Sequence, residues 1–274
     1  MTMAKTQKSV TLIKLGGSTI TDKSIPNSVR TATLRRLIQE ISKAYEKMDE
    51  YLVIGHGSGS FAHVPATQYR TMDGFTGPQS RLGMAITQDS AAQLNRIVVQ
   101  ELLKKDIPAV SLYASNSLVT KNGKAKSYFV DVFREYLQQD LVPVISGDVI
   151  VDSAKGCTIW SADTILPFFA QEFQKHNWKV NRLIHVTSTP GVYRDNTDHS
   201  AGIFETITAQ NAEEVRAAMG EVKGFDVTGG MWTKIEESLA LAQAGIDTVI
   251  LSGEKPQALY KALTGEAEGT IITK

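Results

Sequence analysis

The sequence predicts an α/β protein in which helices cover both faces of a mostly parallel sheet, giving a three-layer αβα sandwich. Short apolar runs typical of buried strands alternate with longer segments whose apolar residues recur every three or four positions. Several strand-like runs end in glycine-rich turns. Hydrophobic residues make up 42% of the 274 residues, enough for a large core. No repeat or linker divides the chain, so we expect one domain over residues 1–274.

The first half of the chain predicts four strands and three helices. A strand is expected at Val10–Leu15, where apolar residues run into two glycines. A helix over Arg30–Lys47 follows, because its apolar residues share one face. Tyr51–Ile54 is the next strand, and Gln79–Lys105 is a long helix that ends before an Ile-Pro pair. The other elements are strands at Ala109–Leu112 and Leu141–Ile145 and a helix at Phe129–Gln139.

The second half begins with a predicted hairpin. Its strands are Val149–Val151 and Cys157–Ile159, around an Asp-Ser-Ala-Lys-Gly turn. A helix over Ser161–His176 and a strand over Arg182–Thr187 follow. The remaining elements are helices at Ala209–Met219 and Met231–Ala244 and a strand at Thr248–Ser252.

The charge and cysteine content argue against several classes of function and against an internal disulfide. Lys plus Arg (29) equals Asp plus Glu (29), so no overall basic field attracts nucleic acid or an anionic membrane. The single cysteine, Cys157, excludes an internal disulfide and fits a reducing compartment. The segment after the polar N-terminus is too short for a signal peptide, and no later run is long enough to cross a membrane. We expect a cytoplasmic protein.

Three glycine-rich loops each follow a strand or open a helix. They are Gly16-Gly17-Ser18, the stretch from His56 to His63, and Thr228-Gly229-Gly230. Glycines let backbone N–H groups approach a phosphate, and loops at the carboxyl ends of parallel strands face one crevice. A single loop of this kind is equally well a surface turn, whereas three together predict an anion-binding crevice.

Three lysines accompany these loops: Lys14, Lys23 and Lys234. Each one alone is adequately explained as a solvated surface charge. Lys234, however, falls in the first turn of a predicted helix, where a cation opposes the helix dipole unless an anion is bound. The three lysines together therefore favour a phosphate-binding site.

Four motifs, in order and spanning almost the whole chain, resemble those of the amino acid kinase superfamily. They are Lys14-Leu15-Gly16-Gly17-Ser18, the Gly55–Phe61 loop, Ser161-Ala162-Asp163, and Asp226–Met231 with Lys234. Within the superfamily the chain is most similar to the isopentenyl phosphate kinases, through Thr21-Asp22-Lys23, His63 and Ser146-Gly147-Asp148.

The resemblance implies an ATP-dependent kinase that phosphorylates isopentenyl phosphate with Mg²⁺ as cofactor and acts as a homodimer. It implies an acceptor-binding half (about 1–150) and a nucleotide-binding half (about 151–274). Lys14, Lys23, Asp163 and Lys234 would be catalytic, with Asp163 organising the lysines and Lys23 stabilising the phosphoryl group in flight. No side chain is expected to ligate the metal. The implied nucleotide contacts are Lys14, Gly16, Gly17, Ser18, Gly59, Asp163, Thr228, Gly229, Gly230 and Lys234.

On the acceptor side, the resemblance implies that His63 grips the substrate phosphate, while His56 is structural. The hydrocarbon tail would lie against the helix that begins near Gln79. The implied acceptor contacts are Ser58, Gly59, His63, Gly147, Met84 and Ile86. Phosphoryl transfer to an anionic phosphate needs positioning and positive charge more than a general base, which agrees with these roles.

Two alternatives stay open. A small phosphonate or phosphate kinase, such as a fosfomycin kinase, shares the histidine in the glycine loop, and a non-catalytic nucleotide or phosphate sensor shares the fold. The chain also departs from the family pattern at Thr187–Pro190, where acidic residues are usual, and this affects the contacts to the nucleoside. Trp232 is expected to pack rather than to stack on a base.

Overall fold

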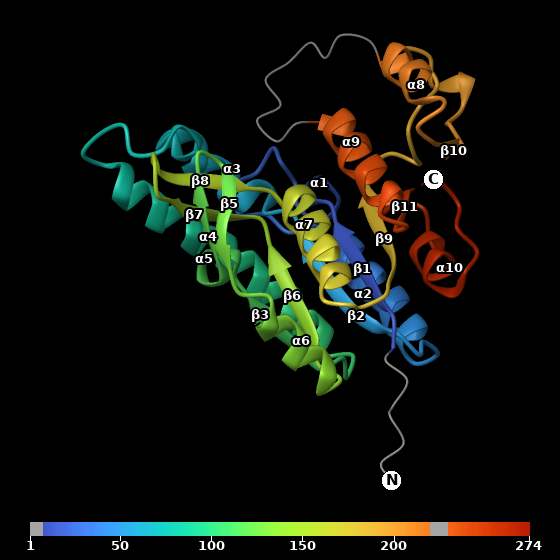
Figure 1. Ribbon diagram of the computed structural model, residues 1–274, viewed down its shortest axis with the longest axis horizontal. Helices are drawn as coiled ribbons and strands as arrows, with labels where there is room; N and C mark the ends of the chain where they lie inside the picture. The colour runs from blue at the N-terminus through green and yellow to red at the C-terminus, as the bar shows by residue number, and fades with distance from the viewer. Residues whose placement is uncertain (1–7, 220–229) are drawn as a thin grey trace.

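The structure is a computed structural model that describes residues 8–219 and 230–274 (Figure 1). An eight-stranded sheet runs in the order β10-β12-β11-β9-β1-β2-β6-β3, and β11, β9, β1, β2, β6 and β3 are mutually parallel. Its strands are β1 (Val10–Leu15), β2 (Tyr51–His56), β3 (Ala109–Leu112), β6 (Val142–Ser146), β9 (Val180–Thr187), β10 (Thr206–Ile207), β11 (Asp247–Ser252) and β12 (Thr270–Ile272).

Helices cover both faces of this sheet, so the predicted three-layer α/β sandwich is confirmed (Figure 1). On β1, Ile13 and Leu15 pack with α2, α4 and α10, whereas Val10 and Leu12 pack with α6 and α7. This alternation follows from the two-residue period of a strand. The helices are α1 (Gly17–Ile20), α2 (Thr31–Tyr45), α3 (Gly59–Gln68), α4 (Ser80–Leu103), α5 (Ala114–Ser117), α6 (Asp131–Gln138), α7 (Ala162–Lys175), α8 (Ala212–Met219), α9 (Gly230–Gln243) and α10 (Ala258–Thr264).

A second sheet of four strands, β5-β4-β7-β8, lies beside the first. It contains the predicted hairpin, formed by β7 (Asp148–Asp152) and β8 (Gly156–Trp160), which pair antiparallel. It also contains a hairpin that was not predicted, β4 (Leu118–Lys121) with β5 (Lys124–Tyr128). Helix α3 was not predicted either, since its sequence was interpreted as a loop.

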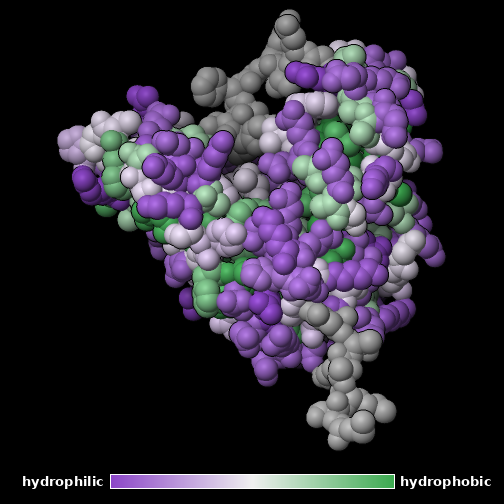
Figure 2. Space-filling model, in the orientation of Figure 1, coloured by the Kyte–Doolittle hydropathy of each residue, from purple (hydrophilic) through white to green (hydrophobic). Residues whose placement is uncertain are grey.

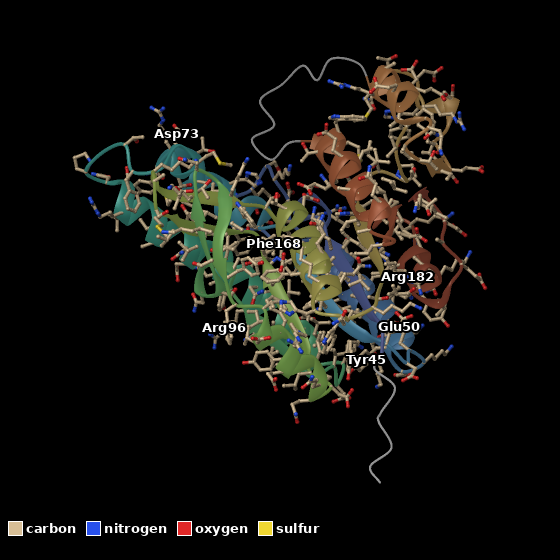
Figure 3. All side chains as sticks on the ribbon, viewed as in Figure 1. Tyr45, Glu50, Asp73, Arg96, Phe168 and Arg182 are labelled. Atoms are coloured by element: carbon tan, nitrogen blue, oxygen red, sulfur yellow. The ribbon has the colours of Figure 1, made fainter. Side chains whose placement is uncertain are left out.

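Labelled residues in Figure 3 mark the two ends of the main sheet. Where β1, β2 and β9 begin, Glu50 lies 3.8 Å from Arg182, and both are labelled in Figure 3 well away from Asp73. Asp73 belongs to the other end, where the strands finish.

Hydrophilic residues cover most of the face in Figure 2, with hydrophobic residues in small patches. Among the described residues, none of the helices is both long and apolar enough to span a membrane.

Asp152 joins the two hairpins of the second sheet. Its buried carboxylate accepts five hydrogen bonds, all between 2.8 and 3.1 Å. The donors are the Thr120 hydroxyl and the backbone N–H groups of Asn122, Gly123, Ala154 and Lys155. Burial opposes ionisation, but these hydrogen bonds outweigh it and lower the pKa of Asp152 below its ordinary value.

We expect Asp152→Ala to lower the free energy of unfolding by about 3 kcal/mol, because four backbone N–H groups and the buried Thr120 hydroxyl lose their acceptor. Since the folded-state pKa is depressed, the contribution of Asp152 is present at neutral pH and is lost as the pH falls toward that pKa. The measurement is urea unfolding at neutral and acidic pH. Asp49→Ala, at a side chain that is 94% exposed, is the control and should change little. Equal effects of the two variants would contradict the prediction.

Candidate active site

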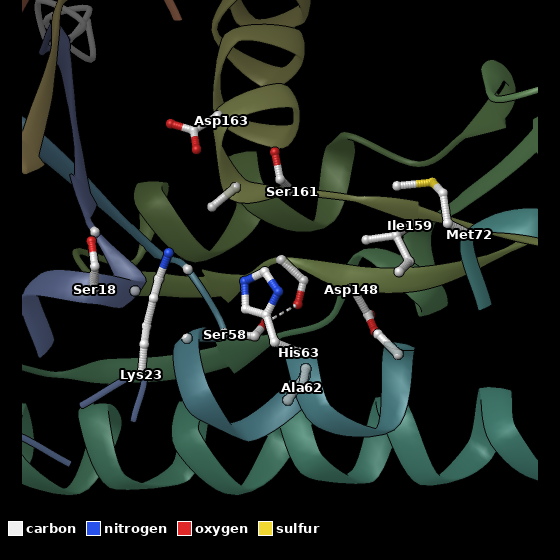
Figure 4. A pocket seen from close by; sticks show the side chains of 18 of the residues that line it. Ser18, Lys23, Ser58, Ala62, His63, Met72, Asp148, Ile159, Ser161 and Asp163 are labelled. Carbon is white, nitrogen blue, oxygen red and sulfur yellow. Dashed lines mark hydrogen bonds between the residues drawn. The ribbon is translucent and has the colours of Figure 1, made fainter. Parts of the chain in front are cut away.

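A cavity of about 590 Å³ opens at the carboxyl end of the main sheet (Figure 4). The residue that directly follows each of β1, β2, β6 and β9 lines it. These residues are Gly16, Gly57, Gly147 and Ser188. Ligands of parallel α/β sheets bind at this end, where loops and helix N-termini converge. The expected crevice is therefore present.

Asp163 holds a cluster of cationic side chains on one wall of the cavity. It lies in the first turn of α7 and is 7% exposed. Its Oδ2 atom is 2.9 Å from Lys14 Nζ and 3.5 Å from Lys234 Nζ, and its Oδ1 atom is 3.5 Å from His185 Nδ1. Lys14, Lys234 and Asp163 all line the cavity. The structure thus brings together three of the residues expected to be catalytic.

The electrostatics of this cluster follow from burial and mutual attraction. Burial would raise the pKa of Asp163, but Lys14, His185 and Lys234 outweigh it and hold the pKa well below its ordinary value. Burial lowers the pKa of Lys14 despite the attraction of Asp163, and the charges of Lys234 and Lys23 lower it further. Burial likewise lowers the pKa of His185. The buried Asp163 carboxylate thus forms ion pairs with two lysines at the cavity wall. One carboxylate does not balance two ammonium groups, and anionic phosphates bound in the cavity would balance the remaining positive charge.

The first two glycine loops pack directly on one another. A Cβ atom on Gly17 would lie 2.7 Å from the Gly59 backbone nitrogen, and one on Gly57 would lie 2.8 Å from the Gly17 nitrogen. These distances exclude any side chain larger than hydrogen at either position. Gly59 also has a φ of +49°, a left-handed conformation that favours glycine. The glycines are therefore needed for the approach of the two loops as well as for any contact with phosphate.

The remaining predicted phosphate contacts also line the cavity. Ser18 and Ser58 do so, and the Ser58 hydroxyl donates to the Gly147 carbonyl at 2.9 Å. In Figure 4 the side chains of Lys23 and His63 point toward the end of α7 that carries Asp163. Lys23 is exposed and His63 is half-buried. Gly230 lines the cavity at the start of α9, whereas Thr228 and Gly229 lie outside the described residues.

His56 is excluded from the cavity, in agreement with a structural role. It is fully buried, and burial lowers its pKa to about 4, so the ring is neutral at pH 7. Its Nδ1 atom donates to the Gly57 carbonyl and its Nε2 atom accepts from the Asn95 amide, both at 3.2 Å. These contacts fix the end of β2 where the glycine loop begins.

The two predicted tail contacts on α4 lie outside the lining of the cavity. Met84 and Ile86 are half-buried and do not line the cavity. Thr87 and Ala91, four residues apart and hence on one helical face, line it instead. Met84 lies on the same face, one turn before Thr87, whereas Ile86 lies about 100° around the helix from Thr87. Other apolar groups at this end of the cavity come from Ala62, Ala66, Met72, Val149 and Ile159.

Two residues near the site were given no role from the sequence. His185 sits directly beside Lys14 on the neighbouring strand, and the only signal for it was one polar residue in an apolar run. Thr21 is buried between the two glycine loops and stands next to the recognised Asp22-Lys23 pair. Near the nucleotide side, Thr187, Ser188 and Thr189 line the cavity. Trp232 packs against the core cluster around Ile235, as expected.

Comparisons with known proteins agree with this geometry. Residues 9–252 match the model of the amino acid kinase family. The isopentenyl phosphate kinases of Methanocaldococcus jannaschii and Methanothermobacter thermautotrophicus are each 32% identical to this chain, covering 96% of it and 98% of their own length. A solved isopentenyl phosphate kinase structure superimposes with a TM-score of 0.81 at 30% identity, covering 96% of this chain and 100% of its own. The chain therefore belongs to the amino acid kinase family, on its isopentenyl phosphate kinase branch.

Proposed function

We propose that this protein transfers the γ-phosphoryl group of ATP to the phosphate of isopentenyl phosphate, giving isopentenyl diphosphate and ADP. One observation carries the proposal: Asp163 holds Lys14 and Lys234 beside two packed glycine loops in a cavity with an apolar end. The relatives that cover 96% of the chain are named isopentenyl phosphate kinases.

In this mechanism the protein positions the two substrates and supplies positive charge around their phosphates. The acceptor phosphate is already an anionic nucleophile, so no side chain has to remove a proton. Lys14, the Gly16–Ser18 loop and Lys234 bind the donor phosphates, and Ser58, Gly59, Gly147 and His63 bind the acceptor phosphate. Lys23 reaches the phosphoryl group as it moves between them. The roles divide the chain into an acceptor-binding half (about 1–150) and a nucleotide-binding half (about 151–274).

Mg²⁺ belongs to the proposal as a partner of ATP. Among the described residues no group of three or more His, Cys, Asp or Glu side chains is placed to hold a metal ion. Three carboxylates from the described part of the chain line the cavity, and each has other partners: Asp163 pairs with lysines, Asp73 pairs with Arg70 at 2.8 Å, and Asp148 accepts from the Ser115 and Val149 N–H groups at 2.9 and 2.8 Å. The residues present do not make a metal site of their own, so phosphate oxygens would hold the ion.

The apolar end of the cavity favours a hydrocarbon tail over a compact polar phosphonate. Ala62, Met72, Ala91 and Ile159 offer methyl and thioether surface to the acceptor. The test is ADP release by the purified protein with isopentenyl phosphate, with fosfomycin and without acceptor. We expect turnover with isopentenyl phosphate. Turnover with fosfomycin alone would favour the phosphonate kinase, and none with either acceptor would favour the sensor.

His63→Ala is expected to raise the KM for isopentenyl phosphate about 10- to 100-fold and to leave the KM for ATP unchanged. The reason is the loss of a charge-assisted hydrogen bond to the acceptor phosphate. Steady-state kinetics with each substrate varied in turn measures both constants. His176→Ala, an exposed histidine at the end of α7, is the control. An unchanged acceptor KM refutes the role of His63.

Two further parts of the proposal concern the state of the protein in the cell. Cys157 is the single cysteine of the chain and is buried, so the chain forms no internal disulfide, which suits the reducing cytoplasm. We expect a homodimer, as the family resemblance implies. Light scattering of the eluted protein should then give twice the chain mass of 29.9 kDa, and a value equal to the chain mass would contradict it.

A further inference from the structure

The hydroxyl of Thr21 connects the two glycine loops. Its Oγ1 atom donates to the Gly17 carbonyl at 2.7 Å and accepts from the Ser60 backbone N–H at 3.0 Å. Gly17 belongs to the first loop and begins α1, and Ser60 belongs to the second loop and lies in the first turn of α3. The Thr21 side chain is 1% exposed, so water does not compete for these bonds. One hydroxyl therefore donates to one loop and accepts from the other.

The space around this hydroxyl allows little movement. A Cβ atom on Gly59 would lie 2.0 Å from Thr21 Oγ1, and one on Gly17 would lie 2.7 Å from the Gly59 nitrogen. The backbones of both loops and the Thr21 side chain thus meet at van der Waals distance. A shift of one loop against the other breaks at least one of the two hydrogen bonds.

Thr21 and Ser60 also hold the segment that carries Lys23, residues 22–28 (the Lys23 segment). Thr21 and Val29 form an antiparallel bridge at the base of this segment. The Ser60 hydroxyl accepts from the Ser28 N–H at 3.2 Å and donates to the Ser28 carbonyl at 3.3 Å. Thr21 and Ser60 therefore hold the Lys23 segment against α3 at both of its ends.

We propose that Thr21 is a positioning residue that fixes the separation of the donor and acceptor loops during phosphoryl transfer. The inference rests on the proposed function, which places ATP at the first loop and the acceptor phosphate at the second. Transfer requires the two reacting atoms to approach within roughly 3–3.5 Å. The two bound anions repel each other and push the loops apart, and the hydrogen bonds of Thr21 oppose this push. Each loop binds its own anion without Thr21, but the approach of the anions depends on it.

The test compares Thr21→Val, which keeps the shape and removes the hydroxyl, with Thr21→Ser, which keeps the hydroxyl. We expect Thr21→Val to lower kcat about 10- to 100-fold, the size of effect that a displacement of about 1 Å produces. The KM values for ATP and isopentenyl phosphate should each stay within about threefold. Thr21→Ser should restore most of kcat.

A matched control separates this effect from a general loss of stability. Thr120→Val also removes a buried hydroxyl with two hydrogen bonds, at 2.9 and 3.2 Å, but Thr120 lies on β4 and does not line the cavity. We expect it to lower the melting temperature and to leave kcat unchanged. Equal kcat values for Thr21→Val and the wild type, or a loss that Thr21→Ser does not restore, would overturn the proposal.

Hydrogen exchange at the Ser60 amide provides a readout that needs no turnover. It should be slow in the wild type and in Thr21→Ser, and faster in Thr21→Val or, if that variant does not fold, in Thr21→Ala. Wild-type protein that fails to phosphorylate isopentenyl phosphate would refute the proposed function, and the exchange rates would still test the connection. Unchanged exchange in the variants without the hydroxyl would show that Thr21 does not join the loops.

Discussion

Asp163→Asn is expected to lower kcat by about three orders of magnitude. The Asp163 carboxylate holds two lysines that come from opposite ends of the chain, Lys14 at 2.9 Å and Lys234 at 3.5 Å. Asparagine keeps the shape but removes the charge, so the two ammonium groups repel each other and leave their positions. Loss of a single preorganised contact to developing charge costs about 10²–10³ in rate, and this change disturbs two of them.

The variant should also change the pH dependence of kcat. Lys14 has to be protonated to bind phosphate, so activity falls as the pH rises through its pKa. Burial already holds that pKa below the ordinary 10.5, and Asp163 is the group that raises it. Without the carboxylate the pKa of Lys14 falls further, so the alkaline limb of the profile moves to lower pH. Measurement of kcat across neutral and alkaline pH checks both the drop and the shift.

Stability must be followed in the same experiment, because loss of one partner of a buried ion pair destabilises a protein by about 3–5 kcal/mol. Glu172→Gln is the control, since Glu172 is a buried carboxylate on the same helix, 2.6 Å from Lys175 and outside the cavity. It should lose stability and keep its kcat. A folded Asp163→Asn protein with nearly full kcat would contradict the role of Asp163.

The central sheet was predictable because its strands are buried on both faces. β1 and β2 appear in the sequence as mostly apolar runs, typical of parallel sheets, and β9 and β11 contain shorter ones, Leu183-Ile184 and Val249–Leu251. Helix α3 was missed because Gly59 and Pro65 argue against a helix locally. It forms because Phe61 and Pro65 are buried and the helix packs against α4. Tertiary packing here overrides a weak local preference.

The hairpin of β4 and β5 was missed although its signal was present. Asn122-Gly123 joins the strands, and both residues have positive φ, as the two-residue turns of hairpins require. Its strands are short, and β5 is mostly exposed, so the hydrophobic pattern gave no support.

The site was only partly accessible from the sequence. Strand ends and glycine loops indicate where anions bind, but the contact between Lys14 and Asp163 joins residues 149 positions apart. That pairing was implied by the family resemblance and not by local pattern. The face of α4 that lines the cavity depends on how the helix is rotated over the sheet. Thr87 and Ala91 were therefore not distinguishable from Ile86 before the structure was known.

Lys23→Met is expected to lower kcat by about 10³-fold and to leave the KM values for ATP and isopentenyl phosphate within about threefold. Lys23 is exposed at the edge of the cavity, and its side chain points toward the end of α7 that carries Asp163 (Figure 4). In the proposed mechanism it contacts the phosphoryl group only during transfer. An interaction made only in the transition state affects kcat and not ground-state binding. Steady-state kinetics separates the two constants.

The exposure of Lys23 makes this variant easier to interpret than a change at Lys14. Substitution of an exposed side chain changes stability by about 0.5 kcal/mol or less, so a loss of kcat reflects chemistry and not unfolding. Lys43→Met, an exposed lysine on α2 outside the cavity, controls for the loss of one positive charge. Lys23→Arg should recover part of kcat, because arginine keeps the positive charge but carries it on a planar guanidinium group in place of an ammonium group. If Lys23→Met raised the KM for either substrate and left kcat intact, Lys23 would bind that substrate before transfer. Lys14 and Lys234 alone would then stabilise the phosphoryl group during transfer.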